Sequence, residues 1–284
     1  MFDLLFFSLP VLLPLLFLAA IHLGFHAPRI EETGNPRDFG FDFARLRIPT
    51  ANGKRLYAWS LPGSRPAGTV IVLHGWGGNA EMMLPIAGPF HRAGYNVLLF
   101  DARGHGRSDR DTFSSLPRFA EDLCHVTDWV QNHLQDSGKI VLLGHSVGAG
   151  AVLLAASQRS DIRAVISISA FAHPDWMMRR YLAKLHLPRF LIGWMLRYVQ
   201  WVIGHRFDDI APMRTLCKIR CPVLLLHGKE DATVPSTDAL AIRQGCGNDL
   251  TEVLLIDGAG HDSVEKIEQH GRQMVEFLAR SGIS

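Results

Sequence analysis

From about residue 41 onward, short runs of β-branched and aliphatic residues alternate with longer segments that repeat apolar residues at helical spacing. Runs of the first kind predict strands, and segments of the second kind predict helices. A regular alternation of the two is typical of an α/β protein. The later strand candidates are nearly all apolar, as expected for parallel strands that helices cover on both faces. The pattern therefore predicts an α/β fold class.

The expected sheet is mostly parallel, has eight strands and is flanked by helices. The strands are predicted at 44–49, 55–60, 69–73, 96–100, 140–143, 164–168, 223–226 and 252–256. The helices between them are predicted at 81–93, 118–134, 148–158, 237–245 and 264–279. No linker among these elements indicates a second independent core.

The composition fits a globular domain. The chain has 284 residues, of which 48% are hydrophobic and 20% charged, with a formal net charge of +2. These proportions exclude a disordered or collagen-like chain, and a charge so near zero argues against a dedicated nucleic-acid binder. The four cysteines lack the paired spacing of a zinc site and are too few for a disulfide framework. We expect buried or idle thiols at Cys124, Cys217, Cys221 and Cys246.

The N-terminus is apolar. Residues 4–25 carry no charged side chain and are long enough to span a hydrocarbon core of about 30 Å as a helix, although Pro10 and Pro14 interrupt them. Asp3 at the start, and the lack of a small-x-small cleavage site, disfavour a cleaved secretory signal. An uncleaved membrane anchor is the preferred interpretation. A cleaved signal and a hydrophobic hairpin within one leaflet stay open as alternatives.

This interpretation divides the chain into three parts. Residues 1–25 are the expected anchor, 26–40 a linker and 41–284 the folded domain. Such an anchor predicts membrane localisation, either single-pass or monotopic. Arg29 and Arg37 follow the apolar run, which by the positive-inside rule favours a cytoplasmic side for the folded domain.

Ser146 stands in the sequence Gly-His-Ser-Val-Gly, residues 144–148, between an apolar strand candidate and a helix candidate of small residues. This is the context of the G-x-S-x-G nucleophile elbow, in which a sharp strand-to-helix turn projects the serine hydroxyl above the sheet. The small neighbours let the helix pack closely at the turn. We therefore predict Ser146 as a catalytic nucleophile.

A serine hydroxyl is a weak nucleophile at neutral pH and needs an adjacent base, itself oriented by a carboxylate. His261 follows the last strand candidate in a glycine-containing loop, and Asp231 follows the strand before it. Serine, aspartate, histidine is the chain order used by folds with this elbow. We predict His261 as the base and Asp231 as its carboxylate, with Glu230 and Asp257 as alternatives for the carboxylate.

The segment His-Gly-Trp-Gly-Gly, residues 74–78, also follows a strand candidate. Its glycines would let backbone N–H groups turn toward a developing oxyanion. We predict the N–H groups of Trp76 and Val147 as the two donors of an oxyanion hole. The sequence has no GxxxxGK[ST] or GxGxxG motif for phosphate or dinucleotide binding. No metal or organic cofactor is implied, because nucleophile, base and donors all come from the chain.

These motifs together resemble the α/β-hydrolase superfamily, and within it the monoacylglycerol-lipase-like and serine-aminopeptidase-like branch. The resemblance covers about residues 41–284 and is carried by the segments 74–78, 101–108, 144–148, 227–235 and 257–261. It implies an α/β-hydrolase fold and serine hydrolase activity. It also implies that Asp101, Arg103 and His105, in the turn after the fourth strand, form a structural network and are not catalysts.

In this family a helical lid is commonly inserted after the sixth strand, where residues 173–206 interrupt the alternation. The segment combines basic residues with aromatic ones, and Trp194, Tyr198 and Trp201 fall on one helical face. Two placements of this face stay open. It packs down on the sheet, or it lines an acyl pocket or meets a lipid headgroup layer.

The sequence therefore predicts a membrane-associated serine hydrolase that cleaves carboxylic esters of lipids or other hydrophobic acyl compounds through an acyl-Ser146 intermediate. A thioesterase or a peptidase with the same triad is an alternative, because the triad specifies acyl transfer and not the leaving group. A non-catalytic, membrane-tethered binding module with the same fold is another. The expected partners are an ester substrate and the membrane, without nucleic acid. The substrate-binding residues and the oligomeric state are not predicted.

Overall fold

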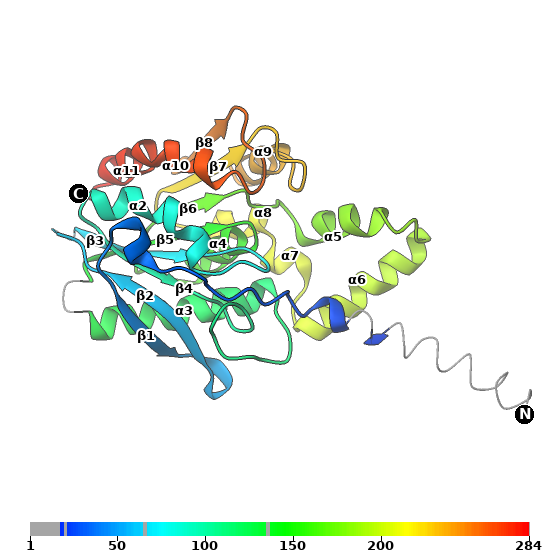
Figure 1. Ribbon diagram of the computed structural model, residues 1–284. Coiled ribbons are helices and arrows are strands. Elements are labelled where there is room, and N and C mark those ends of the chain that lie inside the picture. The colour runs from blue at the N-terminus through cyan, green and yellow to red at the C-terminus, as the bar shows by residue number, and fades with distance from the viewer. Residues whose placement is uncertain (1–17, 20–21, 65–66, 135–136, 284) are drawn as a thin grey trace, which may run out of the picture.

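The computed structural model describes residues 18–19, 22–64, 67–134 and 137–283. Its centre is an eight-stranded sheet with the strand order β1-β2-β4-β3-β5-β6-β7-β8 (Figure 1). The strands are β1 (Ala44–Pro49), β2 (Arg55–Leu61), β3 (Gly68–Leu73), β4 (Asn96–Phe100), β5 (Lys139–His145), β6 (Ile162–Ile168), β7 (Val223–Gly228) and β8 (Thr251–Ile256). The predicted α/β-hydrolase fold is confirmed.

The sheet is parallel from β4 to β8, while β2 pairs antiparallel with both β1 and β4. In the central strands the register aligns Leu73 of β3 with Gly144 of β5, and Gly144 with Ser167 of β6. The loops that follow these strands therefore emerge at one edge of the sheet. That edge is where the predicted functional segments meet.

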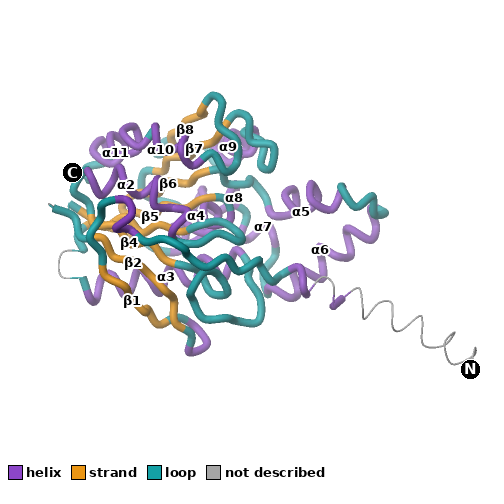
Figure 2. Tube along the Cα trace, viewed as in Figure 1, coloured by secondary structure: helices purple, strands orange, loops and turns teal. Residues whose placement is uncertain are grey.

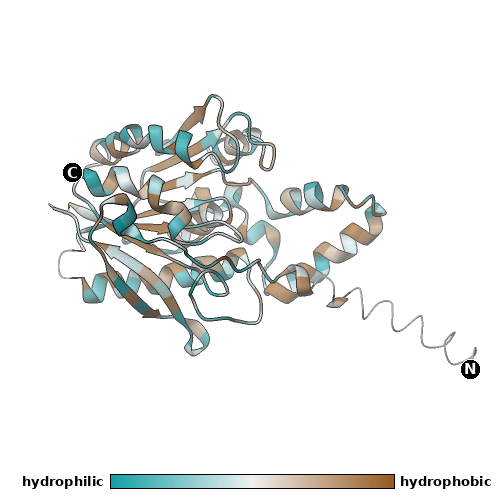
Figure 3. Ribbon diagram, in the orientation of Figure 1, coloured by the Kyte–Doolittle hydropathy of each residue, from teal (hydrophilic) through white to brown (hydrophobic). Residues whose placement is uncertain are grey.

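Helices cover both faces of the sheet, as Figure 2 shows. The main ones are α2 (Leu84–Arg92), α3 (Leu116–His133), α4 (Val147–Gln158), α9 (Thr237–Gln244), α10 (Val264–Gln269) and α11 (Gly271–Arg280). Along β3, Val70 and Val72 pack in the core layer under α2, α10 and α11, whereas Ile71 and Leu73 pack in the layer under α3 and α4. The central strands β3, β4 and β5 are mainly apolar (Figure 3) and buried because both of their faces are covered.

The predicted helix at 264–279 is in fact two helices, α10 and α11, which meet at His270. Close packing explains why the second begins with a glycine. A Cβ at Gly271 would lie 2.2 Å from Pro89 Cγ of α2, so no larger residue fits without moving α2. The periodicity of the sequence could not predict this contact, because α2 and α11 are far apart in the chain.

The lid lies between β6 and β7 and includes α5 (Pro174–Ala183) and α6 (Arg189–Ile203), which extend beyond the sheet (Figure 1). The face of α6 that packs inward carries Ile192, Leu196 and Val199. Trp194 and Trp201 are 46% and 76% exposed. The aromatic face is therefore turned outward, and the expectation that it packs on the sheet is wrong.

The expectation of idle thiols is also wrong for one pair of cysteines. Cys217 and Cys246 form a disulfide across a sequence separation of 29 residues, while Cys124 and Cys221 are free. The bond links the 3-10 turn η4 (Leu216–Lys218) to the loop after α9. Sequence spacing alone does not show that these two loops are adjacent in space.

Within the described part of the chain, no helix is both long enough and apolar enough to cross a bilayer. Most of the expected anchor, at residues 1–17 and 20–21, lies outside the described residues. Phe25, which we counted toward the span, instead packs on the folded domain, with its ring centroid 5.8 Å from that of Phe113. The predicted membrane localisation through a single-pass or monotopic N-terminal anchor is therefore wrong, and we withdraw it.

Candidate active site

Ser146 lies at the turn between β5 and α4 with φ 55° and ψ −115°. Such a conformation is strained for a residue other than glycine and is a feature of the nucleophile elbow. The glycines on either side make the turn possible. A Cβ at Gly144 would lie 2.2 Å from the carbonyl oxygen of Gly148, and a Cβ at Gly148 would lie 2.4 Å from that of His74. The hydroxyl is thus held at the edge of the sheet.

His261 lies in the loop between β8 and α10 and faces Ser146. Its Nε2 is 2.9 Å from Ser146 Oγ, and its Nδ1 is 2.7 Å from Asp231 Oδ2. The structure thus brings the three predicted side chains into one hydrogen-bonded chain. Neither alternative carboxylate takes part, because Glu230 is exposed and the side chain of Asp257 is 84% exposed.

Asp231 is buried, and several donors surround its carboxylate. Its Oδ1 accepts the N–H groups of Thr233 and Val234 at 2.9 and 2.7 Å, and its Oδ2 lies 3.4 Å from His227 Nε2. Burial alone would raise the pKa of Asp231, but hydrogen bonds from His227, His261 and the Val234 N–H outweigh it and lower that pKa. The carboxylate therefore stays ionised at neutral pH and can stabilise a proton on His261.

The loop after β3 lies against the nucleophile, since a Cβ at Gly75 would be 3.0 Å from Ser146 Cβ. The buried ring of His74 holds this loop in place. Its Nδ1 lies 2.6 Å from the Gly75 carbonyl, and its Nε2 accepts the Ala102 N–H at 3.0 Å. One ring nitrogen donates and the other accepts, so the ring is neutral. Burial accordingly lowers the pKa of His74 to about 3.

The two predicted oxyanion donors are placed beside the nucleophile. Val147 begins α4, so its N–H has no acceptor within the helix. Trp76 follows Gly75 in the loop, and Trp76, Ser146 and Val147 line one cavity together. The role of these N–H groups as oxyanion donors stays a prediction.

Asp101, Arg103 and His105 follow β4 and are all buried. Asp101 accepts two backbone N–H groups at 2.8 Å each. Arg103 Nε lies 2.6 Å from a carboxylate oxygen of the buried Asp122. None of the three lines a cavity that contains Ser146. They form a turn network under the loop after β3, as the resemblance implied.

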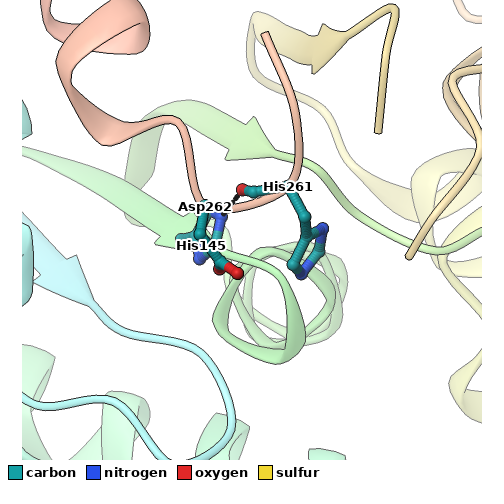
Figure 4. A group of neighbouring side chains, drawn as sticks. All are labelled: His145, His261 and Asp262. Atoms are coloured by element: carbon teal, nitrogen blue, oxygen red, sulfur yellow. Dashed lines mark hydrogen bonds between the residues drawn. The ribbon is translucent and has the colours of Figure 1, made fainter. Parts of the chain in front are cut away.

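His145 is a further residue of the candidate site, and the sequence motifs did not single it out. Its Nε2 lies 2.9 Å from the main-chain carbonyl oxygen of His261 (Figure 4). Because a carbonyl only accepts, His145 donates this hydrogen bond. The contact ties the end of β5, next to the nucleophile, to the loop that carries the base. Its place as the first variable residue of G-x-S-x-G put it next to Ser146 but did not indicate this contact.

His145, His261 and Asp262 are also a group whose ligand atoms lie within 4.8 Å of one another, close enough to be considered for a metal ion (Figure 4). The ring nitrogens of the two histidines, however, already have hydrogen-bond partners. Both ring nitrogens of His261 already face Ser146 and Asp231, and His145 Nε2 faces a carbonyl. We therefore assign the two histidines to hydrogen bonding and not to metal binding.

Two cavities meet at Ser146, and both are also lined by Trp76 and Tyr181. The larger, of about 850 Å³, is lined by His261 and by charged side chains such as Glu81 and Lys266. It is the more polar of the two, and we call it the polar cavity. The smaller, of about 430 Å³, lies under the lid and is mainly apolar. Its lining includes Phe25, Leu116, Val147, Phe171, Met177, Met178, Leu182, Val199, Ile203, Phe207 and Ile210.

The family model described as serine aminopeptidase, S33, matches residues 64–215, more than half of the chain. The chain belongs to the serine aminopeptidase S33 family. The uncharacterized protein YqkD of Bacillus subtilis (strain 168) is 30% identical over 225 residues, which cover 74% of this chain and 72% of that protein. The uncharacterized protein YfhR of Escherichia coli (strain K12) is 28% identical over 247 residues, covering 82% and 79%.

Among solved structures, the esterase Pf2001 of Pyrococcus furiosus superposes with a TM-score of 0.73 at 25% sequence identity, covering 90% of this chain and 98% of that one. Family membership and this likeness establish the chain as an α/β-hydrolase enzyme. In this hydrolase the lid residues that line the apolar cavity recur at helical spacing on α5 and α6, a pattern that sequence periodicity could have indicated. Phe25, far from the lid in sequence, carried no such signal.

Proposed function

We propose that the hydrolase is a serine carboxylesterase for esters with an apolar acyl group, acting through an acyl-Ser146 intermediate. The observation that carries this proposal is the continuous chain from Ser146 Oγ to His261 at 2.9 Å and from His261 to Asp231 at 2.7 Å. These are hydrogen-bonding distances, as general-base activation of a serine requires. The likeness to a protein that is itself an esterase supports the same activity.

In this mechanism Ser146 Oγ attacks the ester carbonyl carbon while His261 Nε2 takes the hydroxyl proton. The carbonyl oxygen becomes an oxyanion, to which the N–H groups of Trp76 and Val147 donate. When the intermediate collapses, the C–O bond to the alcohol breaks and His261 returns the proton to the departing oxygen. Water then attacks the acyl-serine with His261 again as base, releasing the acid and restoring Ser146.

The two cavities suggest where each half of the ester lies. His261 lines the polar cavity but not the apolar one, and Val147 lines the apolar cavity but not the polar one. Because His261 gives its proton to the leaving alcohol, the alcohol belongs in the polar cavity. The acyl chain then occupies the apolar cavity under the lid, next to the oxyanion donors.

The same cavities favour an ester over an aminopeptidase substrate. An aminopeptidase must bind the free ammonium group of its substrate on the acyl side of the scissile bond. The described lining of the apolar cavity includes no aspartate or glutamate to pair with that group. The acids near Ser146, such as Glu81 and Glu265, line the polar cavity on the other side. Thioesters share the acyl half and differ only in the leaving group.

Labelling with a fluorophosphonate probe, followed by hydrolysis assays, tests the proposal. We expect the probe to modify the wild-type enzyme and not Ser146→Ala, and p-nitrophenyl esters to be cleaved by the wild type alone. Parallel assays with acyl thioesters and aminoacyl anilides rank the leaving groups. An unreactive wild type would identify a non-catalytic binding module, and a preference for anilides would identify a peptidase.

A further inference from the structure

Residues 22–34 run across the front of the domain, from the lid toward β1, as the dark blue trace in Figure 1 shows. We call this segment the strap. At its beginning, His22 Nδ1 lies 3.3 Å from Tyr198 Oη of α6. Farther along, the Phe25 carbonyl accepts the Ser114 N–H at 3.0 Å. The strap thus connects the lid to the body of the domain.

The middle of the strap lies on the loop that carries a predicted oxyanion donor. A Cβ at Gly77, in the loop after β3, would lie 3.0 Å from Pro28 Cγ. Gly77 also has a positive φ of 72°, which favours glycine for a second reason. Asn79 Nδ2 donates to the Ile30 carbonyl at 3.0 Å, just beyond this point of contact. The strap therefore covers the oxyanion loop directly.

Charged side chains fix the strap at two further points. Arg29 donates to the carbonyl oxygens of Gly106 and Ser108 at 2.7 and 2.9 Å. The side chain of Glu32 is fully buried, with Oε2 3.2 Å from Arg107 Nε. Displacing the strap would break these hydrogen bonds and this ion pair together. The strap is therefore a wall attached to the domain at several points.

Phe25 is the part of this wall that reaches the substrate cavity. Its side chain packs on Phe113 on one side, with ring centroids 5.8 Å apart, and lines the apolar cavity together with Met177 and Val199 of the lid. Trp76 and Ser146 line the same cavity. Phe25 therefore lines the same cavity as the proposed reacting groups.

We infer that the strap completes the acyl cavity and that Phe25 is a specificity-determining residue, limiting the length of the acyl chain that fits. This inference rests on the proposed esterase function and deepens it. A smaller side chain at position 25 opens the wall to longer chains, and a larger one closes it further. Each additional buried methylene favours binding by about fourfold. The effect should therefore grow with chain length.

The experiment compares the full-length wild type with Phe25→Ala and Phe25→Trp on p-nitrophenyl esters from acetate to dodecanoate. For Phe25→Ala we expect the preferred chain length to increase, with kcat/KM for the longest esters rising about tenfold relative to that for the acetate. For Phe25→Trp we expect the preferred length to decrease. Phe39→Ala is the matched control, because Phe39 is 47% exposed and lines neither cavity at Ser146.

Opposite shifts in the two variants support the inference, because general damage to the site would lower all esters in both. If wild type and both variants share one chain-length profile while Ser146 remains labelled, the strap inference is overturned and the esterase proposal stands. If the wild type cleaves no ester, both fail together. Should Phe25→Ala not fold, as judged by loss of probe labelling, Phe25→Trp and Phe25→Leu decide the question through the direction of their shifts.

Discussion

At the scale of single residues, the turn that carries Ser146 needs glycine, which has no side chain, at the positions on either side of it. Ser146 adopts φ 55°, which costs a non-glycine residue on the order of 1–3 kcal/mol. The turn survives because Gly144 and Gly148 allow backbone contacts that a methyl group would prevent. The elbow therefore depends on close backbone packing, and the Ser146 N–H also donates to the Ile168 carbonyl at 2.9 Å.

Gly148→Ala tests this close packing. The added methyl would lie 2.4 Å from the His74 carbonyl oxygen, so we expect a loss of roughly 1–3 kcal/mol in the free energy of unfolding and a large fall in esterase activity. Gly193→Ala is the matched control, because Gly193 lies within α6 and a Cβ there meets nothing within 4 Å. It should stabilise the enzyme by about 0.4–1 kcal/mol. Urea denaturation measures the free energy of unfolding of both variants. Equal changes in Gly148→Ala and Gly193→Ala would contradict a special need for glycine at position 148.

His145 Nε2 donates to the His261 carbonyl at 2.9 Å, and we expect this hydrogen bond to position the proposed base. His145→Phe removes the donor, so we expect kcat to fall by up to about 10²-fold, the cost of a small misplacement of a catalytic group, while KM changes little. His145→Gln keeps an N–H donor on a flexible side chain and should recover part of the loss. His125→Phe, on the exposed surface of α3, is the control. If Gln and Phe behave alike at position 145, the hydrogen bond does not position the base.

The sequence indicated the triad candidates because each stands in a local motif at the end of a predicted strand, and strand ends meet at one edge of a parallel sheet. It could not indicate the contact of His145 with the His261 backbone. Every residue has a main-chain carbonyl, so the sequence does not show which carbonyl accepts a hydrogen bond. Phe25 was misassigned for a related reason. An apolar side chain next to an apolar run has the same sequence pattern whether it enters a membrane or lines a cavity.

At the scale of elements, the lid is joined to the domain by a bidentate ion pair. Arg180 of α5 donates to both carboxylate oxygens of Asp238 at 2.8 and 2.6 Å, and Asp238 also accepts the Ala172 N–H at 2.9 Å. Asp238 is buried and lies in the first turn of α9. The pair therefore fixes α5, which lines the acyl cavity, relative to the loop that carries Asp231.

Arg180→Met should loosen the lid and leave a buried carboxylate with one partner fewer. Breaking a buried pair typically costs about 3–5 kcal/mol, and the partial exposure of Arg180 puts the expected loss at the lower end. We also expect KM to rise more for long-chain esters than for the acetate. Arg179→Met is a matched control on the same helix, since its pair with Asp175 is largely exposed and worth no more than about 0.5 kcal/mol. Equal losses of stability in the two variants would refute a special role for Arg180.

Element positions were predictable from periodicity because each strand and helix buries a face set by its own residues. The order of the strands, the division of α10 from α11 at Gly271 and the outward aromatic face of α6 were not. Each of these features depends on contacts with residues that are distant in the sequence. For α6 the burial of Ile192, Leu196 and Val199 determines its orientation, and the face with Trp194 and Trp201 is turned outward as a result.

At the scale of the whole molecule, three of the four histidines that are buried in the described part of the chain have lowered pKa values. Burial lowers the pKa of His74 to about 3 and those of His105 and His145 to about 4. In the unfolded chain the same side chains have a pKa near 6.5. Between those values the unfolded state binds protons that the folded state does not. Stability contributed by each neutral histidine is therefore present above pH 6.5 and lost as the pH falls toward its folded pKa.

Buried carboxyl groups oppose this trend, since burial raises the pKa of Asp122 to about 6. A folded state that takes up a proton there gains stability as the pH falls from about 6 toward 4. The pH dependence of the wild type is thus a sum of opposing contributions. A single histidine is isolated by comparing a variant with the wild type, because the carboxyl contribution then cancels.

His105→Gln should make the enzyme less sensitive to acid. Removing one neutral buried histidine reduces the slope of the unfolding free energy against pH by about 1.4 kcal/mol per pH unit between about pH 6 and 4.5. His125→Gln replaces an exposed histidine and should leave the slope unchanged. Urea denaturation of the three proteins at half-unit pH intervals provides the measurement. A slope for His105→Gln equal to that of the wild type would mean that His105 is protonated in the folded enzyme despite its burial beside His74.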